Sequence, residues 1–116
     1  MEIRFQMKGI LVALNQLYEI EKKVKKNGDV SGVQRNLVKM KDAFEELGFA
    51  YEDPMGQPFK ETRTDLDATI SGACTENLVV VEVIKPIIRF VLREEPGQFS
   101  KVVQRGIVVV ESRKEQ

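Results

Sequence analysis

The stretch that decides the fold is Asp53-Pro54-Met55-Gly56-Gln57-Pro58-Phe59, because the character of the sequence changes across it. Before it, hydrophobic residues recur at helical spacing, and after it come β-branched runs at 78–84 and 106–110. Proline stops a helix and stiffens the backbone, and glycine supplies a turn. We therefore expect a rigid joint over residues 50–60, with an aromatic plug at the base of the strand-rich half. Its structural residues are Pro54, Gly56, Pro58 and Phe59.

The first half of the sequence predicts two antiparallel helices. Apolar residues at steps of three and four, with Glu21 in one seam position, indicate an amphipathic helix over residues 2–26. A second helix is expected from Ser31, which has capping-box spacing to Gln34. Gly48, just past the last apolar residue of that helix, is expected to be its C-terminal cap. The short connection between the two helices favours a helical hairpin.

The apolar stripes of these helices are too wide for one hairpin to cover. Two alternatives are open: the helices pack on the chain's own strands, or a second copy of the chain covers them. We favour self-association, because the hairpin precedes the strands as a block and does not alternate with them. The residues expected in the dimer interface are Met7, Ile10, Leu14, Leu17, Leu37, Met40 and Phe44.

The second half predicts strands. Residues 78–84 alternate, and 87–93 resume the alternation after Pro86, which has no N–H to donate to a ladder. A third strand region, 99–111, contains Gly106, which suggests a bulge or a close backbone approach. These segments predict a small antiparallel meander of β-hairpins. The residues that share one face of the first strand are Val79, Val81 and Val83.

Together the two halves predict an α+β protein with segregated parts. The helical, dimerising hairpin is expected over residues 1–49 and the joint over 50–60. A small antiparallel β-wing is expected over 61–112, and a frayed tail over 113–116.

Composition argues against several classes of function. Lys plus Arg and Asp plus Glu number 18 each, which is unlike a nucleic-acid-binding chain. Histidine is absent and Cys74 is the only cysteine, so the usual general base, metal ligands and activated thiol are missing. The carboxylates of Asp65 and Asp67 are interpreted as solvated surface. The lysines within 22–26 suit the negative end of a helix dipole better than a binding patch.

These observations favour a binding or assembly protein over an enzyme. We expect no cofactor, no metal and no nucleic-acid partner. No apolar run approaches the ~20 residues of a membrane span, so we expect no membrane partner. A single cysteine suits a reducing cytosol, so we expect a cytoplasmic location.

The order of the parts resembles the GrpE family, the nucleotide exchange factors of DnaK-type heat-shock chaperones. The residues that carry the resemblance are the helix end Leu47-Gly48-Phe49, the joint 53–59, the valine-rich strand 79–83 and the terminal valines 108–110. The resemblance covers residues 10–112, and the family's long N-terminal coiled-coil stalk has no counterpart in this sequence.

This resemblance implies a homodimeric co-chaperone whose β-wing binds the nucleotide-binding domain of a DnaK-type chaperone and promotes ADP release. Two arginines that bracket the family's last hairpin fall at Lys101 and Gln104, which implies a divergent or dedicated chaperone. The partner-binding residues implied by the resemblance are Lys101, Gln104 and Val110. Arg89 and Arg105 are added on physical grounds, as strand arginines that project from a small sheet, and ordinary surface charge is the alternative for both.

A second class of function stays open at this point. A dimeric adaptor or scaffold with a GrpE-like fold would bind a protein partner without exchange activity, for example by strand addition along an edge of the wing. The two classes are distinguished by whether binding to the chaperone speeds nucleotide release.

Overall fold

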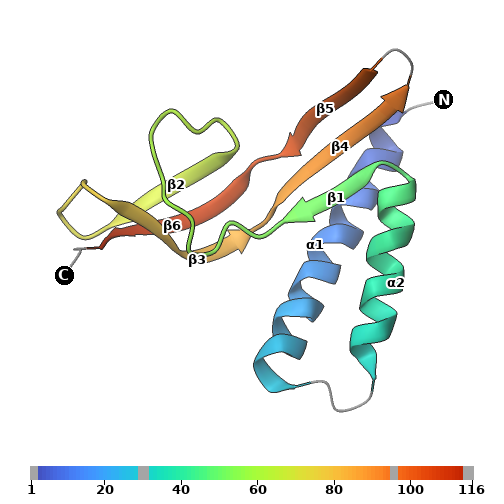
Figure 1. The fold of residues 1–116 in the computed structure, drawn as a ribbon, viewed down its shortest axis with the longest axis horizontal. Coiled ribbons are helices and arrows are strands. Elements are labelled where there is room, and N and C mark those ends of the chain that lie inside the picture. The colour runs from blue at the N-terminus through green and yellow to red at the C-terminus, as the bar shows by residue number, and fades with distance from the viewer. Residues whose placement is uncertain (1–2, 29–31, 95–96, 114–116) are drawn as a thin grey trace. The chain divides into compact units, whose positions relative to one another are not determined.

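The computed structural model describes residues 3–28, 32–94 and 97–113 and contains two helices followed by six strands (Figure 1). The prediction of an α+β fold, with the helices first, is confirmed. The elements are α1 (Ile3–Asn27), α2 (Val33–Glu46), β1 (Phe49–Glu52), β2 (Leu66–Ser71), β3 (Leu78–Lys85), β4 (Ile87–Glu94), β5 (Gly97–Gln104) and β6 (Gly106–Ser112).

The chain forms two compact units. The first unit contains the residues up to Tyr51 and the segment Arg89–Lys101. The second contains Glu52–Ile88 and the residues from Val102 onward. The segment Arg89–Lys101, which lies inside the predicted wing, therefore belongs with the helices.

The two helices lie close to their predicted bounds, and Figure 1 shows them side by side in the first unit. Helix α2 begins after Gly32, whose φ is +72° and which provides no side-chain cap. The predicted capping box at Ser31 lies outside the described residues. The core of this unit combines buried residues of both helices with one aromatic ring from β1: Leu14, Leu17, Tyr18, Leu37 and Phe49.

The predicted antiparallel meander is wrong. The strands form two three-stranded sheets, β1-β4-β5 and β2-β6-β3, and β2 pairs with β6 in parallel. The parallel pair runs without interruption from Leu66 opposite Gly106 to Ser71 opposite Glu111. Strand β2 is missing from the sequence-based prediction because its Asp67 and Ala68 are poor strand formers. Its conformation depends on the ladder that β6 offers, which is a long-range contact.

The predicted face of β3 is also wrong. Val80 and Val83 are buried, whereas Val79 and Val81 are half-buried, so the core face does not follow strict alternation. The register between β3 and β6 shifts between Val80 and Glu82, and again after Val83. Such an irregularity moves the following side chains to the other face of the strand.

Gly106 lies where β5 ends and β6 begins, and the predicted close approach at this residue is confirmed. A Cβ atom added there would lie 2.8 Å from Cδ2 of Leu66 and 3.0 Å from Cγ1 of Ile87. The core of the second unit is built around this contact from aliphatic side chains of its strands: Leu66, Val80, Val83, Ile87, Ile88, Val108 and Val110.

Candidate functional site

The joint Asp53–Phe59 is a turn followed by a short segment that pairs with β3. Gln57 N–H donates to the Pro54 carbonyl at 3.0 Å, and Gly56 has φ +80°, which the third residue of a type II turn requires. The Asp53 carboxylate accepts a hydrogen bond from Met55 N–H at 3.1 Å and closes the start of the turn. Pro54 is fully buried.

Backbone hydrogen bonds hold the second half of the joint on the outer edge of β3. Gly56 N–H donates to Val80 O at 3.0 Å and Phe59 N–H donates to Leu78 O at 2.8 Å. In the other direction, Val80 N–H donates to Gln57 O at 2.9 Å. The second half of the joint therefore covers the outer edge of β3 within the second unit. This arrangement explains why a connection needs such a stiff sequence.

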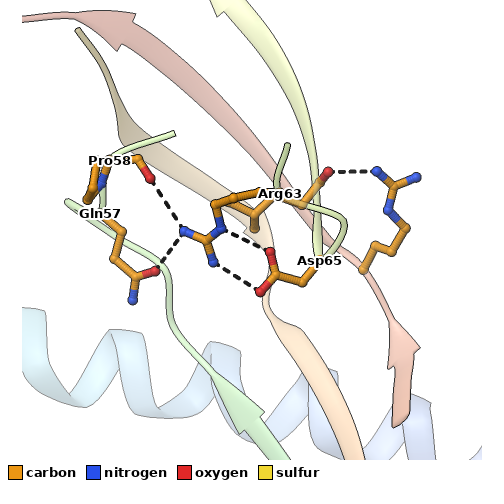
Figure 2. Close-up of polar contacts among 6 residues, drawn as sticks. Gln57, Pro58, Arg63 and Asp65 are labelled. Atoms are coloured by element: carbon orange, nitrogen blue, oxygen red, sulfur yellow. Dashed lines mark hydrogen bonds and ion pairs between the residues drawn. The ribbon is translucent and has the colours of Figure 1, made fainter. Parts of the chain in front are cut away.

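Arg63 fastens the joint to the start of β2 (Figure 2). Its Nε and Nη2 donate to Oδ1 and Oδ2 of Asp65 at 3.0 and 3.1 Å, which is a bidentate pair. Its Nη1 donates to Oε1 of Gln57 at 3.0 Å and lies 3.4 Å from the Pro58 carbonyl (Figure 2). The interpretation of Asp65 as solvated surface is therefore wrong. An arginine two positions before an aspartate was the available sequence signal.

Three of the predicted partner-binding residues lie in the second unit, and each has a structural role there. Gln104 Nε2 donates to the Pro86 carbonyl at 3.0 Å, where β3 gives way to β4. Arg105 is exposed, and its Nη2 donates to the Leu66 carbonyl at 2.7 Å. Val110 has an exposed fraction of 0% and belongs to the core. Gln104 and Arg105 are thus at the surface of this unit, and Val110 is beneath it.

The other two predicted partner-binding residues, Arg89 and Lys101, lie in the first unit. Arg89 in β4 is half-buried, and Lys101 in β5 is exposed. The outward position of a strand lysine is consistent with a surface contact.

Gly48 lies at the point where α2 ends and β1 begins. Its φ is +95°, as the predicted C-terminal cap requires, and its N–H donates to Glu45 O at 2.9 Å. Val91 N–H of β4 donates to the Gly48 carbonyl at 2.7 Å. An added Cβ would lie 2.8 Å from Cε1 of Phe90 and 2.9 Å from the Val91 carbonyl oxygen. Glycine is therefore required both by the backbone conformation and by the space.

The predicted dimer-interface residues divide into three groups. Leu14, Leu17 and Leu37 are buried within a single chain. Half-buried are Met7, Ile10 and Phe44, and Met40 is exposed. Other apolar helix residues that sequence reasoning did not assign to the interface are exposed: Val12, Ile20 and Val38.

Glu21 joins the two helices to β1. Tyr51 Oη donates to Glu21 Oε1 at 2.8 Å, and Lys41 Nζ donates to Oε2 at 3.1 Å. The Tyr18 ring meets the Tyr51 ring edge-on, with centroids 5.6 Å apart. Burial raises the pKa of Glu21, but the hydrogen bonds from Tyr51 and Lys41, with the charges of Lys41 and Lys25, outweigh it and lower the pKa below its ordinary value of 4.5.

Three features of the part of the chain that the structure describes concern candidate metal ligands, the cysteine and the helices. Within 3–28, 32–94 and 97–113, no group of three or more histidine, cysteine, aspartate or glutamate side chains comes together. Cys74 is exposed and is not part of a disulfide among the described residues. In the same part of the chain, no helix is long and apolar enough to cross a membrane.

Comparison with protein-family models finds no match to this chain, and no curated protein or solved structure is significantly similar to it. Function therefore has to follow from the residues and the geometry described above.

Proposed function

We propose that this protein is a GrpE-like nucleotide exchange factor, a non-enzymatic homodimer that promotes ADP release from a DnaK-type chaperone. The observation that carries the proposal is the order of its parts. A helical pair ends at Gly48, a stiff Asp-Pro-Met-Gly-Gln-Pro-Phe joint follows, and valine-rich strands come last. This is the order on which the resemblance to the GrpE family rests.

The residues that we propose to contact the partner are polar side chains of each unit taken by itself: Arg89 and Lys101 in the first unit, and Gln104 and Arg105 in the second. Lys101 and Arg105 are exposed, and Gln104 and Arg89 are half-buried. Val110 lies in the core of the second unit, so we propose that it supports Gln104 and Arg105 there and does not contact the partner itself. Since hot spots favour arginine, Arg89 and Arg105 are the strongest candidates for large losses of affinity.

The homodimer that we propose forms through the helices of the first unit. Val12, Val38 and Met40 are 55%, 47% and 48% exposed, which is a large apolar area for one helical pair. A second copy of the chain would cover these side chains by helix packing. The buried leucines of the predicted interface would then form the core beneath the contact.

Exchange would work by differential affinity. A protein that binds the open, nucleotide-free chaperone better than the closed form shifts the population toward release. Reciprocity requires nucleotide to weaken the grip of this protein on the chaperone by the same factor. A tenfold coupling needs only about 1.4 kcal/mol, which a few strand side chains can provide.

The test is to load DnaK-type chaperones from the same organism with fluorescent ADP and to measure release. We expect the protein to accelerate release, and Lys101→Glu to weaken the effect at least about tenfold. Lys39→Glu, at an exposed lysine of α2, is the matched control and should retain activity. No acceleration with any of these chaperones would refute the proposal. Binding without acceleration would favour the adaptor alternative.

A further inference from the structure

The two outer edges of the β2-β6-β3 sheet, those of β3 and β2, differ in how far other parts of the chain cover them. The joint covers the start of the β3 edge through its backbone hydrogen bonds to Leu78 and Val80. Further along β3, two register shifts interrupt the strand. Bulges and covering segments are the devices by which proteins stop an edge from pairing with another chain. The β3 edge is therefore protected along its length.

For strand β2, the described residues show neither a covering backbone hydrogen bond on the outer edge nor a register shift. The strand pairs with β6 over six consecutive residues without a register shift. Gly106 N–H donates to the Asp65 carbonyl, so the direction of the backbone groups along β2 follows from strand alternation. The groups that point toward β6 belong to Asp67, Thr69 and Ser71, and those that point away belong to Leu66, Ala68 and Ile70.

A side chain confirms this assignment at the start of the strand. The Leu66 carbonyl, which points away from β6, accepts a hydrogen bond from Arg105 Nη2 instead of a ladder bond. Among the residues the structure describes, no backbone hydrogen bond reaches the outward N–H and C=O groups of Ala68 or Ile70. The edge thus presents a short row of alternating donors and acceptors at strand spacing.

A groove within the second unit includes one residue of this edge strand, Ile70. It has a volume of about 430 Å³, and its lining is mixed: the apolar side chains are Pro58, Phe59, Ile70 and Leu78, and the polar ones are Lys60, Glu61, Thr75 and Asn77. The Ile70 side chain is 39% exposed. Asp67, which is exposed, lies on the opposite face of β2 and is the only charged residue of that strand.

We propose that the outer edge of β2 binds an extended segment of a partner polypeptide by strand addition. The row of backbone donors and acceptors has the spacing that another strand requires. The exposed Ile70 side chain favours aliphatic side chains at alternate positions of that strand, on the Ile70 face. Asp67 selects a lysine or arginine on the other face, since opposite charges stabilise cross-strand pairs. A second copy of this chain fits less well, because its β2 carries no cation to meet Asp67.

The probe is the synthetic peptide acetyl-Lys-Val-Thr-Val-Lys-Val-Thr-amide, titrated into the full chain and followed by amide NMR and hydrogen exchange. Before peptide is added, the amides of Asp67 and Thr69 should be protected and those of Ala68 and Ile70 should not. We expect the peptide to bind with a Kd below about 1 mM and to protect Ala68 and Ile70. The same peptide with proline in place of the central valine should not bind.

Two variants test the edge independently. Ala68→Pro removes an outward N–H without touching the β6 ladder, so it should fold and bind at least about tenfold more weakly. Ile70→Glu places a charge in the groove and should weaken binding similarly, whereas Thr69→Glu, on the opposite face of β2, should not.

Several outcomes would overturn the proposal. Binding that neither Ala68→Pro nor Ile70→Glu weakens would do so, as would absence of binding by the alternating peptide. Protection of Ala68 and Ile70 that rises with protein concentration alone would assign the edge to a second copy. None of these experiments involves a chaperone, so the exchange proposal stands or falls separately.

Discussion

Replacing Gly48 with alanine is expected to lower the free energy of unfolding of the first unit by about 2–5 kcal/mol. Two costs combine at this position. A residue with a Cβ at φ +95° is strained by about 1–2 kcal/mol. The added methyl group would also lie 2.9 Å from the Val91 carbonyl oxygen and 2.8 Å from the Phe90 ring, and such overpacking costs about 1–3 kcal/mol.

Relaxation at Gly48 is restricted by its neighbours. The Val91 N–H donates to the Gly48 carbonyl at 2.7 Å, so β4 cannot move away without losing that hydrogen bond. The Phe90 ring packs against Phe49 with centroids 4.9 Å apart. Gly28 supplies a matched control, because its φ is +85° and an added Cβ meets nothing within 4 Å. Gly28→Ala should therefore cost only about 1–2 kcal/mol, the strain without the clash.

Urea denaturation followed by intrinsic tyrosine fluorescence measures this effect. The chain has two tyrosines and no tryptophan, and both tyrosines, Tyr18 and Tyr51, lie in the first unit. The signal therefore reports unfolding of that unit alone. If the Gly48 and Gly28 variants lost equal stability, the steric part of the reasoning would be refuted. If Gly48→Ala left the free energy of unfolding unchanged, the backbone-strain part of the reasoning would be refuted as well.

Three further predictions concern substitutions of single residues. Glu21→Gln should lower stability by about 1–3 kcal/mol at neutral pH. Because the folded-state pKa of Glu21 is lowered, the wild-type stabilisation is complete above pH 4.5 and is lost as the pH falls through the folded-state value, so the variant should show a flatter acid limb by tyrosine fluorescence. Arg63→Lys keeps the charge but loses the two-pronged contact, and it should cost about 1–2 kcal/mol in thermal denaturation, whereas Arg35→Lys on exposed α2 surface should be neutral. Gly106→Ala should cost about 1–3 kcal/mol, because its Cβ meets the Leu66 side chain at 2.8 Å; circular dichroism showing no change in melting would contradict this contact.

The helices could be predicted from the sequence because their signal is local. The three- and four-residue spacing of apolar side chains sets the buried face of α1, and Glu21 lies on that face. Its carboxylate is accommodated there because Tyr51 and Lys41 donate hydrogen bonds to it. The spacing of residues 3–27 does not predict these two hydrogen-bond partners, because they belong to α2 and β1. The exposed Val12 and Val38 were likewise outside the predicted interface.

The strands were harder, since their order and register depend on long-range pairing. Strand β2 contains Asp67 and Ala68 and becomes a strand only beside β6. The core face of β3 depends on a register shift after Val80, which alternation cannot foresee. Arg63 and Asp65 are two positions apart in the sequence, but the structural role of their ion pair is evident only when Arg63 is seen to bind Gln57 of the joint as well.

The central place of β6 has a consequence for the order in which the protein folds during synthesis. Its residues pair with β2 on one side and with β3 on the other, yet they follow both in the chain. Leu66 must wait for Gly106, about forty positions later, before the parallel ladder can start, and closing such a long loop is slow. On the ribosome, β2 and β3 therefore emerge without their common partner, and a chaperone that shields exposed valines would be useful to this chain itself until β6 is complete.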